Sequence, residues 1–324
     1  MSTRHMHRFL FGALVIALSI EVQSAASAAE TVTIGKADAN ASPILPANVA
    51  DKLGLFKKHG LDATIADFTG GSKLSQAMVA GGVDIGVGAG TEMAFVSKGA
   101  PIIAVCEGMA PIPFIGIAVP WDSPAHAVAD LKGKKIGISS AGSLTDWLAK
   151  ELSNHEGWGP NGVTSVAIGN GAAAVLAAFR TNTIDADLSV TSNIFNWEEK
   201  KEGRLLVPVS TFVGNIAAGT IYATQHLIAT DPDALRGFLA AWLETIDYMT
   251  KHKAETVKIE SEVTGYSANV IAKEYDITIG AFSRDCKFDA ASLNNLKRAF
   301  VDQKLVETPP DMSKLYTEAY LLKH

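Results

Sequence analysis

Two stretches of the chain, AMVAGGVDIGVGAGTE (77–92) and AFRTNTIDADLSVTSN (178–193), match one another at an offset of about one hundred residues. In this alignment Asp84 falls on Asp185, and the apolar Val87 falls on Leu188. Each stretch is typical of a helix end, a turn, a short apolar strand and a small polar loop. The match therefore indicates that one strand-and-helix unit occurs twice.

The units that precede these stretches repeat in the same order. FTGGSKL (68–74) aligns with IGNGAAA (168–174), and TIGKADANASP (33–43) aligns with KIGISSAGSLT (135–145). All four are typical of loops that carry the chain from a strand into a helix. Because such units resemble one another in general, a single match means little. Three matches in one order predict two lobes of similar fold.

Short apolar runs alternate with helical patterns along the chain, which is the signature of α/β architecture. Beyond residue 225 the pattern becomes helical, with Asp231 as the expected N-cap and Pro232 as the first residue of a helix. Apolar residues then recur at helical spacing. We expect strands at 31–36, 62–67, 83–88, 102–107, 114–119, 135–139, 164–168, 185–190, 205–209 and 216–224.

Two α/β lobes have a predictable place for a ligand, because open sheets bind ligands outside the carboxyl ends of their strands. Asp38 directly follows a strand, so its carboxylate is placed to bind an ammonium, amidine or hydroxyl group. Glu92, at a helix start, is explained equally well by the helix dipole. The cleft should be lined by loops 37–43, 70–73 and 89–92 on one side and 139–143, 169–172 and 190–193 on the other.

The segment KKIGISSAGSLTDWLAKEL (134–152) raises the question of a catalytic serine, because it leads small hydroxyl residues into a helix start. A nucleophile elbow requires G-x-S-x-G, and Ala141 stands where the last glycine should be. Ser143 begins a capping box instead. Ser139 and Ser140 remain free to contact a ligand. An anion at this helix start would compete with the carboxylate of the acidic capping-box residue.

Motifs of other reaction types are missing from the sequence. It contains no His-Glu-x-x-His or Cys-x-x-Cys pattern for zinc and no G-x-x-x-x-G-K-[ST] phosphate loop. Most histidines outside the N-terminal segment fall in expected turns or on helix surfaces. We therefore expect no catalytic residues, no metal site and no cofactor.

The N-terminal segment predicts export. A basic start is followed by about a dozen apolar residues at 9–20, too few to span a bilayer, and then by Ala26-Ser27-Ala28, which fits a cleavage site. We expect residues 1–28 to be a cleavable signal peptide and the mature protein to be periplasmic; a membrane anchor is the alternative that this length disfavours. The formal net charge of −6 argues against nucleic acid as a partner.

Cys106 and Cys286 are the only cysteines in the sequence. An oxidising compartment would allow them to pair. Cys106 ends the apolar run PIIAVC (101–106), which favours a buried free thiol. The sequence leaves the pairing open, and we expect the free thiol.

The order of these segments resembles that of the type II periplasmic solute-binding proteins of ABC importers, in the class that binds nitrate, sulfonates, taurine or thiamine precursors. The resemblance covers essentially the whole mature chain, and its specificity lies in the ordered series of segments. The loop DANASP (38–43) lacks the aromatic residue of the thiamine-precursor binders, so the sequence does not identify the solute. The carrying segments are LGLFKKHGLDATI (53–65), SKLSQAMVAGGVDIGVG (72–88), SKGAPIIAV (97–105), ADLKGKKIGISSAGSL (129–144) and DPDALRGFLAAWLETIDYM (231–249).

The resemblance implies a two-lobed clamshell in which each lobe is a mixed sheet flanked by helices. Lobe 1 would hold 30–118 and 223–324, lobe 2 would hold 119–222, and the hinge crossings would lie near 117–120 and 220–225. It implies a monomeric substrate-binding component that delivers a small polar or anionic solute to a membrane permease with its ATPase. An enzyme like the thiamine-pyrimidine synthases and a periplasmic ligand sensor are the alternatives.

The resemblance and the loop positions together propose the residues that contact the solute. These candidates are Asp38, Asn40, Ser42, Gly71, Ser72, Thr91, Glu92, Ser139, Ser140, Gly142, Asn170, Thr191 and Asn215.

Overall fold

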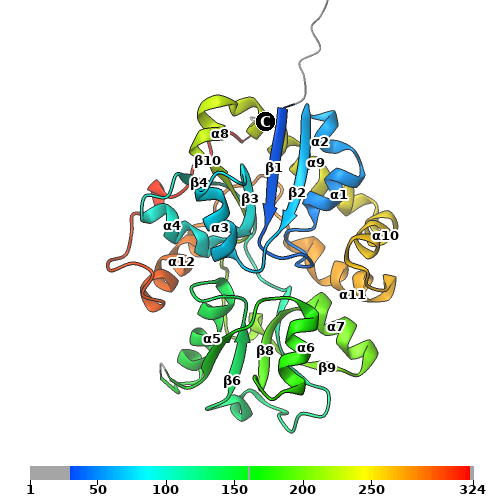
Figure 1. Cartoon of the computed structure of the whole chain (residues 1–324), viewed down its shortest axis with the longest axis vertical. Helices are drawn as coiled ribbons and strands as arrows, with labels where there is room; N and C mark the ends of the chain where they lie inside the picture. Colours follow the sequence, from blue (N-terminus) through cyan, green and yellow to red (C-terminus); the bar gives the residue numbers. More distant parts are fainter. Residues whose placement is uncertain (1–29, 160, 322–324) are drawn as a thin grey trace, which may run out of the picture.

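The computed structural model describes residues 30–159 and 161–321, so the expected signal peptide, 1–28, lies outside the described residues. Within them the chain forms ten strands in two five-stranded sheets. Each strand lies within two residues of the position expected from the sequence. Figure 1 shows the two sheets as the centres of two lobes, one above the other. The prediction of a two-lobed α/β fold is confirmed.

The two sheets have the same topology. In each, three parallel strands are followed in space by a fourth strand that runs antiparallel to both of its neighbours. The sheet of lobe 1 has the order β2 (Leu61–Asp67), β1 (Glu30–Lys36), β3 (Ile85–Ala89), β10 (Ala218–Thr224), β4 (Ile102–Met109). The sheet of lobe 2 has the order β7 (Thr164–Ala167), β6 (Lys135–Ile138), β8 (Ala186–Val190), β5 (Ile115–Pro120), β9 (Gly203–Pro208).

The internal repeat is visible in the hydrogen bonds of its two aligned aspartates. The carboxylate of Asp84 accepts from the backbone N–H of Thr33 at 2.8 Å. The carboxylate of Asp185 accepts from the backbone N–H of Lys135 at 2.9 Å. Each aspartate thus fastens the start of its strand to the first strand of its own lobe. The alignment made from the sequence therefore matches equivalent positions of the two lobes.

The chain passes between the sheets twice. β4 belongs to the first sheet and β5 to the second, so the first crossing falls at residues 110–114. β9 belongs to the second sheet and β10 to the first, so the second crossing falls at 209–217. Both crossings come earlier in the chain than the expected hinge positions, 117–120 and 220–225. The reason is that β5 and the whole of β10 are strands of the sheets and not connections between them.

Helices cover both faces of each sheet, and none of the described helices is both long and apolar enough to cross a membrane. Lobe 2 carries α5 (Leu144–His155), α6 (Ala172–Arg180) and α7 (Thr191–Lys200). Lobe 1 carries α1 (Pro46–Lys52), α2 (Leu55–Lys58), α3 (Gly71–Val79), α4 (Met93–Ser97), α8 (Gln225–Thr230), α9 (Pro232–Lys251), α10 (Lys253–Thr264), α11 (Ala268–Thr278) and α12 (Ala290–Asp302).

The long helix α9 shows why this sequence folds as it does. Asp231 caps it by accepting from the N–H of Ala234 at 3.0 Å, and Pro232 occupies the first turn, as expected. Its apolar stripe is buried, and Trp242 packs against Phe238 with ring centroids 6.1 Å apart. The stripe therefore belongs to the core of lobe 1 and not to a ligand site.

The two lobes also touch on both flanks of the space between them. On one flank Phe195 of α7 packs with Ile271 and Tyr275 of α11, in an apolar cluster separate from the main core. On the other flank Arg298 of α12 forms an ion pair with Glu151 of α5 at 2.9 Å. Figure 1 shows these helix pairs on opposite sides of the molecule.

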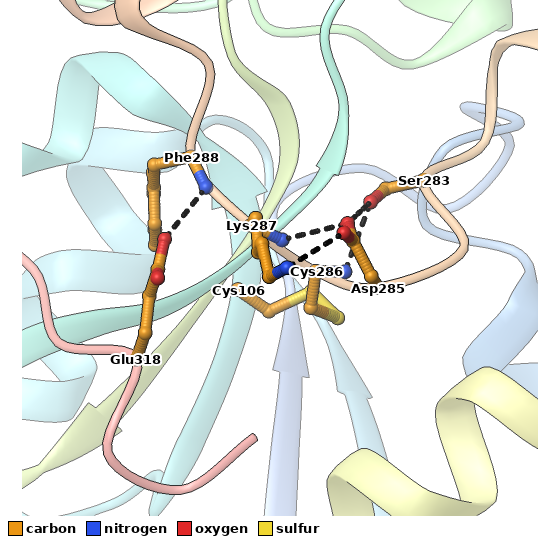
Figure 2. The surroundings of a disulfide bond; sticks show 7 residues. All are labelled: Cys106, Ser283, Asp285, Cys286, Lys287, Phe288 and Glu318. Carbon is orange, nitrogen blue, oxygen red and sulfur yellow. Dashed lines mark hydrogen bonds and ion pairs between the residues drawn. A yellow bond between two sulfur atoms is a disulfide. The ribbon is translucent and has the colours of Figure 1, made fainter. Parts of the chain in front are cut away.

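Cys106 and Cys286 form a disulfide, so the expectation of a buried free thiol is wrong. Cys106 lies on β4, and the chain around Cys286 runs beside that strand: Glu107 N–H donates to the Cys286 carbonyl at 3.1 Å. Figure 2 shows the hydrogen bonds of Ser283 and Asp285 that hold the turn next to the sulfurs. The sequence showed the apolar strand but not its partner, because the two cysteines are 180 residues apart.

Candidate ligand-binding site

A cavity of about 90 Å³ lies between the lobes at the carboxyl ends of the parallel strands. Each of the six loops expected to line a cleft contributes at least one residue to its wall. At roughly 10–15 Å³ per water-sized probe, the cavity has room for about half a dozen water molecules. It is therefore the size of a small solute.

Five of the thirteen candidate residues line this cavity: Asp38, Gly71, Glu92, Ser139 and Asn170. The structure places the others outside its wall. These are Asn40, Ser42, Ser72, Thr91, Ser140, Gly142, Thr191 and Asn215.

Hydrogen bonds join the two lobes directly at the edge of the cavity. The side-chain amide of Asn170, in lobe 2, donates to the Asp38 carboxylate at 2.6 Å and to the Ala37 carbonyl at 3.1 Å. The hydroxyl of Ser72, in lobe 1, donates to the Ala141 carbonyl of lobe 2 at 3.1 Å. These bonds exist only while the lobes are in contact, so this is a closed arrangement.

Several candidates outside the wall also connect the lobes. Thr191, at the start of α7, donates to Glu274 of α11 at 2.6 Å. The amide of Asn40 lies 3.4 Å from Asn193, whose oxygen accepts from the Tyr266 hydroxyl at 2.6 Å. Their polar groups therefore face the interface beside the cavity.

Three of the remaining candidates, Thr91, Asn215 and Gly142, have local hydrogen-bond partners. Thr91 donates to the carboxylate of the adjacent Glu92 at 2.9 Å. Ser42 is buried, and Asn215 is exposed on the second crossing, where its carbonyl accepts from Asn295 at 2.5 Å. Gly142 donates its N–H to the side chain of Asp146.

The serine loop that precedes α5 is a capping structure. Ser143 accepts from the N–H of Asp146 at 3.3 Å, so the expected cap is confirmed. The Asp146 carboxylate accepts from Gly142 N–H at 2.9 Å and pairs with Lys150 at 3.0 Å. Ser139 exchanges hydrogen bonds with hydroxyl groups of this loop at 3.0 Å. Among the described residues that line the cavity there is no histidine.

Glycines at the start of α3 allow the lobes to approach. Gly70 has φ +121°, and a Cβ there would lie 2.7 Å from the Ser140 hydroxyl of the other lobe. A Cβ on Gly71 would overlap the Glu92 carboxylate. Glycine at these two positions thus leaves room for Ser140 on one side and Glu92 on the other.

Three carboxyl groups line the cavity, Asp38 and Glu92 from lobe 1 and Asp187 from lobe 2. Burial raises the pKa of Asp38 to about 6, against the opposing effects of the N–H groups of Asn40 and Ala41. Burial also raises the pKa of Glu92 to about 7 and the pKa of Asp187 to about 7. The cavity therefore holds acids that gain or lose protons near neutral pH.

Asp187 was missed by sequence reasoning, which searched loops and not strands. It lies inside β8 and is 3% exposed, and only the Ser189 hydroxyl, among the described residues, donates to it. The signal was available: an acid in the middle of an apolar strand is costly to bury without a partner. Asn193, one turn into α7, also lines the cavity and was not proposed.

Two sheets of one topology around an inter-lobe cavity define a type II periplasmic binding protein fold, as the sequence resemblance implied. The chain belongs to the NMT1/THI5-like family, whose model matches residues 42–256.

Two kinds of curated protein are similar to this chain. A Brucella abortus (strain 2308) protein that carries the name "Putative binding protein BAB2_1146" is 27% identical over 217 residues, which cover 66% of this chain and 66% of that protein. The 4-amino-5-hydroxymethyl-2-methylpyrimidine phosphate synthase THI11 of Saccharomyces cerevisiae is 26% identical over 296 residues, covering 86% of this chain and 84% of the yeast protein.

Among solved structures, the alkanesulfonate-binding protein SsuA from Xanthomonas axonopodis pv. citri, bound to MOPS, is similar with a TM-score of 0.74. The match covers 89% of this chain and 98% of that chain at 19% identity, so it establishes the fold alone.

Proposed function

We propose that this chain is the exported substrate-binding component of an ABC import system. It captures a small polar solute in the inter-lobe cavity and delivers it to a membrane permease with its ATPase. The observation that carries the proposal is the cavity itself, whose wall comes from both lobes and whose edge is closed by cross-lobe hydrogen bonds such as that of Asn170 with Asp38.

Capture needs no reaction. A solute that contacts both lobes binds the closed form better than the open form, so it shifts the equilibrium towards closure by its differential affinity. The crossings at 110–114 and 209–217 serve as the hinge, since only these two connections join the described parts of the sheets. Closure would then present a changed surface to the permease.

Three features support a periplasmic location and this set of partners. The N-terminal segment has the pattern of a signal peptide. The disulfide between Cys106 and Cys286 is suited to an oxidising compartment. The net charge of −6 disfavours nucleic acid. We expect a monomer.

A pyrimidine synthase is the second candidate, because the yeast relatives carry that name and match most of the chain. The family resemblance implies that such synthases rely on active-site histidines and a cysteine-rich motif, and the cavity argues against that chemistry. No histidine or cysteine lines the described cavity, and both cysteines are paired with each other away from it. We therefore favour binding over catalysis; release of a pyrimidine product from a pyridoxal-type substrate would reverse that choice.

A thermal-shift screen of small solutes tests the proposal, with nitrate, methanesulfonate, taurine and 4-amino-5-hydroxymethyl-2-methylpyrimidine as the first probes. A true ligand at about 100 times its Kd adds about 2.7 kcal/mol of stability. Asp38→Ala and Asn170→Ala should weaken the response, whereas Asp62→Ala, at an exposed position of β2, should not. Equal binding by all three variants would contradict the cavity assignment.

A further inference from the structure

The cavity wall has a one-sided charge. Asp38, Glu92 and Asp187 line it, and no Lys or Arg does so among the described residues. The nearest buried cation, Lys36, is engaged elsewhere, with Asp67 at 3.0 Å and Asn48 at 2.6 Å. Carboxylates accept hydrogen bonds and repel anions. The wall is therefore unsuited to an anionic solute.

The described hydrogen bonds of Asp187 do not explain why an acid is buried at this position. At 3% exposure its carboxyl receives one hydroxyl hydrogen bond, from Ser189, and no described donor reaches its Oδ1 atom. In the internal repeat, Asp187 aligns with Gly86 of lobe 1, so the fold forms at this position without an acid. A buried, under-bonded carboxyl is costly unless a partner arrives. The cavity is where that partner can bind.

Carboxylates of the protein itself lie near two helix starts beside the cavity. The carboxylate of Glu92 sits against Gly71 at the start of α3 and accepts from the N–H of Ala89 at 3.1 Å. The carboxylate of Asp146 accepts from Gly142 N–H at the start of α5. The negative charge of these carboxylates disfavours an anion at the same two helix starts.

The size of the cavity and the spacing of its acids limit what kind of cation fits. A volume of about 90 Å³ suits a group of a few heavy atoms. The described part of the chain contains no cluster of three or more His, Cys, Asp or Glu side chains placed to hold a metal ion. An organic cation with several N–H donors can instead reach acids that stand apart.

We propose that the cavity selects a small organic cation, with an ammonium or amidinium head held between Glu92 of lobe 1 and Asp187 of lobe 2. This inference rests on the proposed function and narrows its solute class. It also supplies a driving force for closure. Ionised acids on opposite lobes repel one another when the cavity is empty, and a cation between them converts that repulsion into attraction.

The sign of the pH dependence follows from the raised pKa values. A cation binds the ionised carboxyls, so its affinity should rise as pH increases through about 6 to 7, where Asp38, Glu92 and Asp187 lose their protons. An anion would show the opposite slope. The charged or titratable groups near these acids are Lys36 and Tyr266, beside Asp38, and Tyr222, beside Glu92. Burial raises the pKa of Tyr266 to about 12 and the pKa of Tyr222 well above its usual range.

An isosteric series tests the charge preference: acetamidinium, acetamide and acetate have nearly the same shape but are cationic, neutral and anionic. Thermal unfolding of the full mature chain is followed at pH 8.0 with each probe up to 50 mM, about the range that a four-atom ligand requires, and sodium chloride keeps the ionic strength equal. We expect stabilisation by acetamidinium alone, and a weaker effect at pH 5.5. Stabilisation by acetamide or acetate that equals or exceeds that by acetamidinium overturns the proposal.

Matched variants locate the effect. Glu92→Gln and Asp187→Asn should each weaken acetamidinium binding about tenfold to a hundredfold, the range expected for a hydrogen bond to a charged group. Glu260→Gln is the control, since Glu260 is an equally buried acid with a raised pKa that does not line the cavity. Unchanged affinity in both cavity variants, or an equal loss in Glu260→Gln, also overturns the proposal.

The same experiment separates the two levels of inference. If acetate or methanesulfonate stabilises the chain and Asn170→Ala abolishes the effect, solute capture in the cavity is supported and the preference for a cation is contradicted. If acetamidinium stabilises the chain but none of the cavity variants alters the effect, the assignment of the ligand site to this cavity is contradicted.

Discussion

Removal of the disulfide should lower the stability of the chain by an amount that its position predicts. Cys106 and Cys286 are 180 residues apart, so the bond closes a long loop in the unfolded chain. Loop-closure entropy for this length is worth about 5 kcal/mol at 25 °C, the upper end of the range of about 2–5 kcal/mol found when native disulfides are removed. The double substitution Cys106→Ala/Cys286→Ala should therefore destabilise the fold by about 2–5 kcal/mol.

This free energy converts into a measurable change in unfolding temperature. Unfolding entropy is about 2.1 cal/mol/K per residue, or about 0.6 kcal/mol/K for the roughly 290 described residues. The double variant should then unfold about 3–8 °C below the oxidised wild type. Circular dichroism melts in the presence and absence of a phosphine reductant make the measurement.

The control is the wild type itself. Reduced wild type should unfold near the double variant, because a buried thiol behaves as a small apolar side chain. The reductant should leave the double variant unchanged, because that variant contains no cysteine. If oxidised wild type and the double variant unfold within about 1 °C of each other, the loop-entropy reasoning is refuted for this bond.

Three further outcomes are expected. Gly70→Ala should weaken solute binding by hindering closure, because the new Cβ would lie 2.7 Å from the Ser140 hydroxyl and φ is +121°; calorimetric affinity equal to that of the wild type would count against this. Asp231→Ala should cost about 1 kcal/mol in urea unfolding through loss of the α9 cap, whereas Asp233→Ala, whose side chain is 94% exposed, should cost far less; equal losses would show that the cap is not responsible. The unliganded chain should be less stable at pH 8.5 than at pH 5.5. Burial raises the pKa values of several carboxyls in the folded chain to between about 6 and about 8. Their contribution to the free energy of unfolding is fully present below the pKa of the unfolded chain and is lost as pH rises through the folded pKa values. Greater stability at pH 8.5 than at pH 5.5 would contradict this predicted direction.

The fold was predictable because its signals are local and repeated. Strand periodicity, the cap at Asp231 and the cap at Ser143 each depend on a few neighbouring residues, and the structure has all of them. The described hydrogen bonds lack the other half of the expected capping box, because the Asp146 carboxylate accepts from the N–H of Gly142 and not from that of Ser143. The repeat of Asp84 in Asp185 added the long-range information that two lobes share one topology. The ends of parallel strands then located the loops that line the cavity.

Features that depend on pairing across the fold were not predictable in the same way. The membership of β5 in the second sheet is decided by its partners, so the crossings were placed several residues too late. The disulfide needs two segments 180 residues apart to meet. Thr191 follows a strand as a ligand residue would, yet its hydroxyl faces Glu274 of α11. Asp187 lies within a strand, where loop-based reasoning does not look.

The central claim is that the lobes close around a solute, and an inter-lobe distance tests it most directly. Spin labels on Lys73→Cys of α3 and Ala173→Cys of α6, both exposed, report the separation of the lobes by electron–electron resonance, since the native cysteines are paired. Saturation with a solute that raises the unfolding temperature should shift the distances towards one short, narrow population. An unchanged distance distribution with that solute bound would contradict capture by closure.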